Sequence, residues 1–371
     1  MSDAKKFWVG LNLVKGIGAV RFSSLLDYFG DAETAWNASP ANLRDAGLTA
    51  KVIEAFLITR SETVLDQLWE KIVNQNITVL TWNDETYPRR LKEINQPPPV
   101  IYVRGSLTIK DEWSIAVVGT RRVSPYGRQA AEEIASGLAR NGLTVVSGLA
   151  RGIDAIAHQA TLKSGGRTIA VLGSGVDRIY PPEHRRLAAQ MIEQGAVISD
   201  YPPGTPPEGI NFPPRNRIIS GLSLAAAIIE AGERSGALIT ASFAADQGRD
   251  VFALPGSIFS PQSAGTNRLI EKGAFPLLSI KSILDVLNLT LVHEKQTASR
   301  MLPVNEIEAS LLDVLSHDPQ HVDEIRNRSD LPIEKVTASL TLMELKGLVR
   351  QVGGMKYVRL LEPKTEYRIG E

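Results

Sequence analysis

Arginines recur in short glycine-containing loops of this 371-residue chain, and each of these loops directly follows an apolar run of strand length. The run that ends at Val118 continues as GTRRVSPYGR, with three arginines and no acidic residue, and the next run continues as SGLARGID. Guanidinium groups bind phosphate oxygens bidentately, and glycine lets backbone amides approach an anion closely. The repetition predicts a binding site for a polyanion.

A second candidate lies at residues 211–221, which read NFPPRNRIISG. The ring of Phe212 offers a face on which a base can stack, the arginines can meet phosphates, and Asn216 can orient a base edge. Prolines in the same stretch would hold a loop in one conformation and so reduce the ordering cost of binding. The alternative is that Phe212 fills the core and anchors the loop, since Pro213 and Ile218 beside it suit packing.

Apolar runs of strand length alternate with helical segments from about residue 84 onward, and these elements must position the loops. The runs read SIAVVG, TVVSG, TIAVLG, AVISD, LAAAIIEA and VFALPG. Such near-continuous apolar strands are typical of a parallel sheet that helices cover on both faces. The predicted fold class is therefore α/β, a Rossmann-like, doubly wound and mostly parallel sheet. Ligands of such sheets bind outside the carboxyl ends of the strands, where the arginine-bearing loops fall.

Arg167 is a weaker candidate because it stands just before a strand. It would lie at the opposite end of the sheet unless its loop folds back. Each isolated feature also has a plain explanation, since glycines permit tight turns in any such fold and single arginines are usually solvated or paired with surface carboxylates. The prediction of a polyanion site therefore depends on the repetition and not on one loop.

Helical patterns flank the sheet in sequence. Residues 1–83 read as a helical domain of the SAM or helix-hairpin-helix type, in which Gly16 and Gly18 would let backbone amides approach a DNA phosphate. A plain αα-hairpin whose glycines only permit the turn explains them equally well. Beyond a predicted linker at 289–304, residues 305–371 read as three helices and a β-hairpin, a winged-helix-like domain. Such domains often bind duplex DNA, but small versions dock proteins.

Composition and missing motifs exclude several classes of function. The formal net charge is zero, so a nucleic-acid site has to be a local basic patch. Without cysteine the chain has no disulfide, thiol nucleophile or cysteine-ligated zinc. No Walker A loop occurs, and the nearest match to the dinucleotide fingerprint, GSGVDR, has Arg178 in place of the third glycine. We expect no cofactor. Because no signal peptide and no stretch of 18 apolar residues is found, we also expect a cytoplasmic protein without membrane association.

A nucleotide-processing hydrolase of the Rossmann type stays open as an alternative. In such an enzyme Asp154 and His158 would form an acid–base pair on one helix, whereas the more common explanation is that Asp154 starts the helix and His158 is packed or hydrogen-bonded locally. Glu230 lies in IIEAGERSG, a segment similar to nucleotide-hydrolysing Rossmann proteins. The PGGxGT loop of those proteins is missing, which weighs against this alternative. The five histidines show no metal-ligand spacing with carboxylates.

Six longer motifs together resemble the DNA processing protein A family, also called DprA or Smf. They read VVGTRRVSPYG, VVSGLARGIDAIAH, GGRTIAVLGSGVDRIYPPEH, NFPPRNRIISGLS, ERSGALITASFAADQGRDVFALPG and GTNRLIEKGA, and with their surroundings they cover about residues 84–285 densely. Motifs of this length and order are far more specific than any short pattern. Two positions depart from the family's pattern, since Arg167 stands where Lys is common and many relatives have another residue at Pro214.

The resemblance implies a protein that binds single-stranded DNA without catalysis, loads the RecA recombinase onto it, and acts in DNA uptake, natural transformation and recombination. It also implies a homodimer formed through the Rossmann-like domain, residues 84–288. Gly119, Thr120 and Arg121 should then hold a phosphate, and residues 211–217 should form a wall of the strand-binding pocket. The predicted DNA-binding residues are Gly119, Thr120, Arg121, Arg122, Ser147, Gly148, Arg151, Arg167, Asn211, Phe212, Arg215, Asn216 and Arg217.

Overall fold

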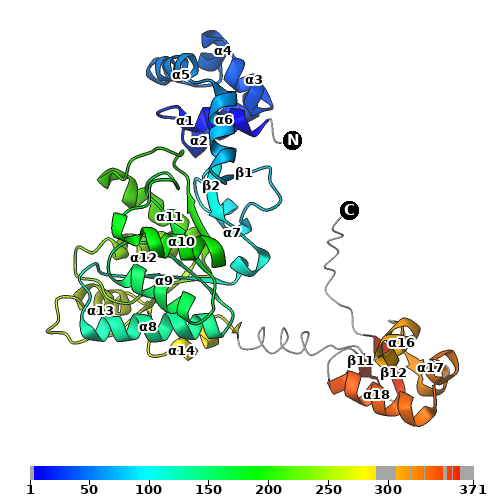
Figure 1. Cartoon of the computed structure of the whole chain (residues 1–371). Helices are drawn as coiled ribbons and strands as arrows, with labels where there is room; N and C mark the ends of the chain where they lie inside the picture. Colours follow the sequence, from blue (N-terminus) through cyan, green and yellow to red (C-terminus); the bar gives the residue numbers. More distant parts are fainter. Residues whose placement is uncertain are drawn as a thin grey trace. The chain divides into compact units, whose positions relative to one another are not determined.

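The computed structural model describes residues 4–289, 306–316, 319–329, 331–345, 349–352 and 354–359. The chain divides into two compact units, Met1–Ile283 and Leu284–Glu371, and each is described by itself (Figure 1). Apart from Leu289, the predicted linker at 289–304 lies outside the described residues. The predicted boundaries of the domains therefore stay a prediction.

Six helices occupy the first part of the larger unit, as the sequence predicts for residues 1–83. Their bounds are α1 Lys5–Leu13, α2 Ala19–Phe29, α3 Ala32–Asn37, α4 Pro40–Asp45, α5 Ala50–Glu62 and α6 Leu65–Asn74. Gly16 turns the chain between α1 and α2 with a φ of +96°, a left-handed conformation that glycine adopts without steric cost. The core of these helices includes Trp8 and Phe22, whose ring centroids lie 4.9 Å apart.

The same core extends from these helices onto the first two strands of the sheet, β1 Thr78–Thr81 and β2 Val100–Gly105. The hydroxyl of Tyr102 on β2 donates a 2.9 Å hydrogen bond to Oδ1 of Asn12, and Nζ of Lys5 lies 2.6 Å from a carboxylate oxygen of Asp84. The six helices are thus attached to the sheet by apolar packing and by polar contacts.

A nine-stranded sheet forms the centre of the larger unit, with the strand order β1-β2-β6-β5-β4-β3-β7-β8-β9. The six predicted strands are β3 Ser114–Val118, β4 Thr144–Ser147, β5 Thr168–Val171, β6 Ala196–Ser199, β7 Ala225–Ile228 and β8 Asp250–Ala253, and all six are confirmed. From β6 to β9 (Phe275–Pro276) the pairing is parallel, whereas β2 pairs antiparallel with both β1 and β6. The chain runs outward from β3 in both directions, so the predicted doubly wound fold class is confirmed.

Helices cover both faces of this sheet (Figure 1). Helices α9 Ile153–Lys163 and α10 Arg185–Gln194 pack on the face that carries Ala170 and Leu172, and α8 Pro125–Arg140 lies against α9. Helices α11 Phe212–Leu222 and α12 Ala237–Asp246 pack on the face that carries Ile169 and Val171. Because side chains alternate along a strand, both sets of residues on β5 are buried. The remaining elements are α7 Arg89–Lys92, α13 Ala264–Glu271, α14 Ile280–Val286, η1 Ile109–Glu112, η2 Pro182–His184 and η3 Gly209–Asn211.

The stretch at 211–217 is not the stiffened loop that the prolines predict. It forms the end of η3 and the first turns of α11, with Pro213 and Pro214 in the first helical turn. A proline is tolerated there because its missing N–H would have no partner within the helix, and its fixed φ suits helical backbone. The prolines therefore start a helix that presents Phe212 at its amino end.

The smaller unit confirms the winged-helix prediction. Three helices, α16 Glu306–Val314, α17 Val322–Ser329 and α18 Ile333–Leu345, accompany a three-stranded sheet ordered β10-β12-β11. Strands β11 Val349–Gln351 and β12 Lys356–Arg359 form the predicted antiparallel hairpin, and β10 Gln320–His321 pairs with β12. Among the described residues, the core of this unit includes Leu311, Ile325 and Leu340. In the described parts of both units, no helix has the length and apolar character required to cross a membrane.

Because each unit has its own apolar core, we expect a chain that ends at Thr297 to keep the larger unit folded. Its melting temperature should match that of the corresponding transition in the full chain to within about 2 °C, as measured by calorimetry. A fall of about 5 °C or more, or aggregation of the shortened chain, would show that the second unit stabilises the first.

Candidate functional site

A cavity of about 740 Å³ opens at the carboxyl ends of β3 and β7, the point where the strand order reverses. Three segments line most of it, namely the loop after β3, the amino end of α11, and the segment from the exit of β7 into α12. Of the predicted DNA-binding residues, those that line it are Gly119, Thr120, Arg121, Arg122, Phe212, Arg215 and Asn216. The expectation that the loop after β3 and residues 211–217 share one edge therefore agrees with the structure.

The amino end of α8, next to the loop after β3, already holds a carboxylate. Glu230, which follows β7 and is buried, accepts a 3.0 Å hydrogen bond from the backbone N–H of Ser124 and a 2.5 Å bond from its hydroxyl. Gly127 makes this approach possible, since a Cβ at that position would lie 2.1 Å from Oε2 of Glu230. The carboxylate of Glu230 thus lies at the amino end of α8, where the helix dipole favours a negative charge.

A buried guanidinium closes the floor of the cavity. Nη1 of Arg215 donates to the carbonyl oxygens of Gly148, at 2.9 Å, and of Val171. Burial lowers the pKa of Arg215 to about 10, so the group is still charged at neutral pH. Asp154 is buried as well, and its carboxylate accepts from the N–H of Gly148 at 3.1 Å. Burial raises the pKa of Asp154, and the charge of Arg215 opposes that rise.

Three other arginines at this cavity carry charges that no acid compensates. Arg121, Arg122 and Arg234 are exposed, and within the described part of the chain their side chains make no ion pair or hydrogen bond. Arg121 also lies close enough to Arg215 to lower the pKa of that buried guanidinium further. The cavity therefore has a positive potential although the whole chain is neutral.

Two aromatic rings lie at the wall of the cavity. The ring of Phe212 is half-buried, and its centroid is 5.7 Å from that of Tyr180, which is 38 % exposed. The guanidinium carbon of Arg215 lies 5.9 Å from the Phe212 centroid, a cation–π distance. Beside this pair, Nδ2 of Asn216 donates to the carbonyl of Gly236 at 3.3 Å. Phe212 thus both contacts its neighbours and offers part of its ring to the cavity.

Several predicted residues do not line this cavity. Ser147 is buried and donates to the carbonyl of Val117 at 2.7 Å, and Gly148 is buried next to the guanidinium of Arg215, which leaves no room for a Cβ. Arg151 is exposed, but its Nε lies 2.5 Å from Oε1 of Glu183.

Asn211 and Arg217 also lie outside the cavity lining. The carbonyl of Asn211 accepts a 3.4 Å hydrogen bond from the hydroxyl of Tyr201. Arg217 is half-buried and pairs with Asp200, at 2.7 Å. Both arginines of the RNR triplet are therefore engaged within the fold, whereas the sequence interpretation has them meet phosphates.

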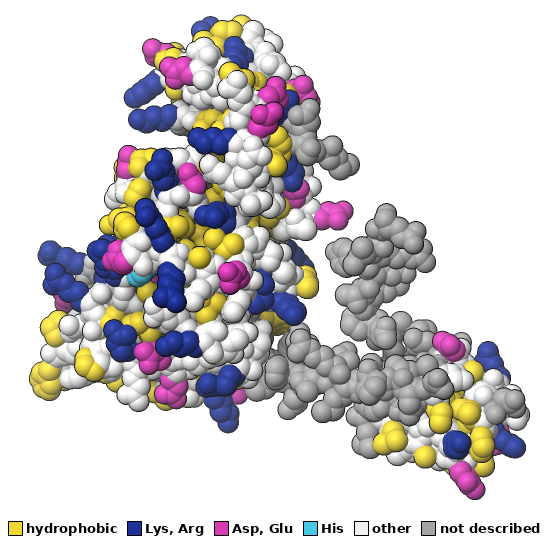
Figure 2. All heavy atoms as spheres, in the orientation of Figure 1, with side chains coloured by type: hydrophobic (Ala, Val, Ile, Leu, Met, Phe, Trp, Pro, Cys, Tyr) yellow, Lys and Arg dark blue, Asp and Glu magenta, His cyan; other side chains and the backbone are white. Residues whose placement is uncertain are grey.

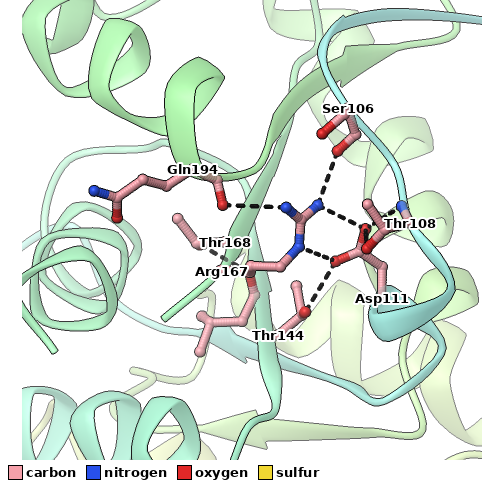
Figure 3. A network of polar contacts seen from close by, with 8 residues as sticks. Ser106, Thr108, Asp111, Thr144, Arg167, Thr168 and Gln194 are labelled. Atoms are coloured by element: carbon pink, nitrogen blue, oxygen red, sulfur yellow. Dashed lines mark hydrogen bonds and ion pairs between the residues drawn. The ribbon is translucent and has the colours of Figure 1, made fainter. Parts of the chain in front are cut away.

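Arg167 lies at the other end of the sheet, just before β5, and is not part of this site. Figure 3 shows its guanidinium directed at the carboxylate of Asp111, with Nε and Nη2 at 3.0 and 2.9 Å from the two carboxylate oxygens. Nη2 also donates to the carbonyl of Ser106 at 2.9 Å. The prediction that Arg167 belongs to the site is therefore wrong. A residue that precedes a parallel strand lies at the amino end of the sheet, and the loop of Arg167 does not fold back.

The sequence interpretation missed Tyr180 and Arg234. Tyr180 follows the glycine-rich segment after β5, and Arg234 stands in the segment between β7 and α12. Both follow the carboxyl ends of strands, which is the signal that pointed to the other residues. Counting every aromatic or basic residue after these strands would have found them.

The three side chains of the hydrolase alternative, Asp154, His158 and Glu230, do not meet at one site. Asp154 lines the cavity, whereas Glu230 is engaged at α8 and His158 is fully buried outside the lining. The hydroxyl of Thr168 donates to the carbonyl of Val145, so it accepts from Nδ1 of His158, at 2.6 Å, and Nε2 has no partner. In the described segments, no group of three His, Asp or Glu side chains is arranged to hold a metal ion.

Comparison with known protein families gives two matches along the chain. Residues 78–288 match the family described as DNA recombination-mediator protein A, and residues 296–355 match the DprA winged helix domain. The chain is 37 % identical to protein Smf of Synechocystis, over 96 % of this chain and 99 % of that protein. It is 44 % identical to DNA processing protein DprA of Streptococcus pneumoniae, over 54 % of this chain and 71 % of that protein.

Two solved structures have a similar fold. The crystal structure of DNA processing protein A from Streptococcus pneumoniae is 34 % identical, with a TM-score of 0.67 over 76 % of this chain and 97 % of that chain. A structure of DNA processing protein A from Helicobacter pylori, reported for its single-stranded DNA binding mode, is 30 % identical. Its TM-score is 0.52, over 58 % of this chain and 96 % of that chain.

The buried His158 should make stability depend on pH. Burial is the main cause that lowers its pKa from 6.5 to about 3 in the folded chain. Below pH 6.5 the unfolded chain therefore takes up a proton that the folded chain does not, and the free energy of unfolding falls as the pH falls. Between pH 7.5 and 5 this amounts to about 2 kcal/mol.

Urea unfolding of wild type and His158→Asn at several pH values checks this. The difference in the free energy of unfolding between the two proteins should shrink as the pH falls. Only the wild type has a histidine that takes up a proton on unfolding. If the free energies of unfolding of the two proteins change in parallel with pH, His158 has the same pKa in the folded and in the unfolded chain.

Proposed function

The chain belongs to the DNA recombination-mediator protein A family, also called DprA or Smf, and from that premise we propose that it binds single-stranded DNA in the cavity at the carboxyl ends of β3 and β7. The observation that carries the proposal is the combination at one cavity of three uncompensated arginines with a pair of aromatic rings. Single strands are bound by such combinations, in which cations follow the phosphates and aromatic faces stack on bases.

The contributions of the residues follow from their surroundings. Arg121, Arg122 and Arg234 are exposed and meet phosphates. Phe212 and Tyr180 offer ring surface to bases, which are accessible in a single strand and hidden inside the stack of a duplex. Arg215 does not contact the strand directly but holds the amino end of α11 against β4 and β5.

We further propose that the protein loads the RecA recombinase onto bound strands during DNA uptake and recombination, and that it acts as a homodimer formed through the Rossmann-like domain. The family supports a role in DNA processing. The recombinase, the dimer and the absence of catalysis rest on the resemblance alone. The binding of strands is tested first because it is the step that the cavity supports directly.

Replacing Arg121 by Glu tests the proposed site. The change removes one phosphate contact and repels another, so we expect the affinity for a 20-nucleotide strand to fall tenfold or more, about 1.4 kcal/mol. The loss should shrink at high salt, since phosphate contacts act through counterion release. Fluorescence anisotropy at several salt concentrations measures both effects.

Arg128→Glu is the matched control for this experiment. Arg128 is an equally exposed arginine on α8 that does not line the cavity and lies 4.0 Å from Glu132. Its replacement should change affinity by less than threefold at moderate salt. Equal affinities for Arg121→Glu and wild type, with both proteins folded, would remove the cavity from the proposal.

Replacing Phe212 by Ala separates stacking from charge. Stacking contributes about 1–3 kcal/mol per base by alanine substitution, so the affinity for single strands should fall about fivefold to a hundredfold, while the salt dependence barely changes. Tyr28→Ala, which removes an exposed ring from the helical part, should leave affinity unchanged. A flattened salt dependence, or a large loss of stability, would mean that Phe212 holds the arginines in place and does not meet a base.

A further inference from the structure

A second cavity, of about 480 Å³, adjoins the first. Strand β2, the segment 177–182 and helix α10 provide most of its lining. Tyr180 and Pro207 line both cavities. The two cavities therefore adjoin at these two residues.

The second cavity is basic. Its lining includes Arg104, Arg178 and Arg185 against one acidic residue, Asp177. Oδ1 of Asp177 already accepts a 2.8 Å hydrogen bond from the N–H of Gly204. Its Oδ2 lies 3.8 Å from Nε of Arg178, too far for a hydrogen bond. Three guanidinium groups and one carboxylate leave an excess of two positive charges.

These arginines are available to a ligand. Arg178 and Arg185 are exposed and Arg104 is half-buried, and in the part of the chain that the structure describes neither Arg104 nor Arg185 has an ion-pair partner. Arg185 stands in the first turn of α10, where the helix dipole disfavours a cation. Its charge therefore does not stabilise α10 through the helix dipole. Figure 2 shows several basic side chains over the region of α10 and α11.

Apolar side chains complete the lining, among them Ile179, Ala188 and Ile192. A surface that combines guanidinium groups with aliphatic carbon suits a strand whose phosphates are joined by sugars that carry bases. It suits a free inorganic anion less well, because such an anion gains nothing from the aliphatic part.

We propose that a single strand bound in the first cavity continues past Tyr180 and Pro207 into the second, where Arg104, Arg178 and Arg185 bind its phosphates. The inference rests on the proposed function and lengthens the part of the strand that the protein contacts. Grooves that bind single strands cover about 4–16 nucleotides per domain. A strand of about five nucleotides would then occupy the first cavity, and a longer one would fill both.

The experiment compares the double variant Arg178→Gln/Arg185→Gln with wild type on two thymidine oligonucleotides, of 5 and 20 nucleotides. Glutamine removes the charges without adding repulsion. For the longer strand we expect a tenfold or greater loss of affinity. The slope of log affinity against log salt should also become less steep by about 1.4, since each phosphate contact to a single strand contributes about 0.7. For the shorter strand, measured by competition, we expect less than a twofold change.

A matched control keeps the net charge the same as in the double variant. Arg128→Gln/Arg186→Gln removes two exposed arginines that line neither cavity, and it should bind both strands like wild type. Melting temperatures of all the proteins show that they are folded. A loss for the longer strand that is specific to the Arg178 and Arg185 variant supports the inference.

The other outcomes overturn it in distinguishable ways. If Arg178→Gln/Arg185→Gln binds the longer strand like wild type while Arg121→Glu does not, the second cavity is not part of the path and the proposed function stands. Equal losses for both lengths would place the short strand at these arginines and contradict the continuous path. If wild type binds neither strand, the proposed function itself fails, and the extended path fails with it.

Discussion

The guanidinium of Arg215 is the contact on which the site depends. It is buried, stays charged at neutral pH, and binds the carbonyl oxygens of Gly148 and Val171, which lie at the carboxyl ends of β4 and β5. An unpaired charge in this position would be very costly, and the buried carboxylate of Asp154 opposes that cost. One side chain thus fixes the amino end of α11 to two strands. Phe212 and Asn216, on either side of it, are placed by that attachment.

The arginines near the carboxyl ends of the strands fall into two groups, those engaged within the fold and those exposed to solvent. Arg215 is engaged by the carbonyls of Gly148 and Val171, and Arg217 by the carboxylate of Asp200. Arg121, Arg122 and Arg234 have no such partner within the described residues and are exposed. The first group holds helix α11 in place, and the second gives the cavity its exposed positive charge. A count of basic residues would not have separated them.

Much of the architecture could be predicted from the sequence, because strands buried on both faces need continuous apolar runs and helices need their caps and periodicity. The roles of individual charges could not, since they depend on residues far along the chain. Glu230 lies more than a hundred residues from Ser124, and nothing near GTRRVSPYGR indicates that a carboxylate will fill the start of α8. Likewise, Asp111 is 56 positions from Arg167. Local patterns identified the edge of the sheet, whereas the distant partners decided which residues face its cavity.

Glu230 also joins the two loops that border the cavity. Its carboxylate holds Ser124 at the start of α8, and its own carbonyl accepts a 2.7 Å hydrogen bond from the N–H of Thr120. The exits of β3 and β7 are therefore braced against each other before any ligand arrives. The two loops that border the cavity are thus held in one arrangement by the hydrogen bonds of Glu230. The strand that we propose as the ligand of this cavity would therefore meet two loops that are already joined, so diffusion and electrostatic steering would set the rate of association.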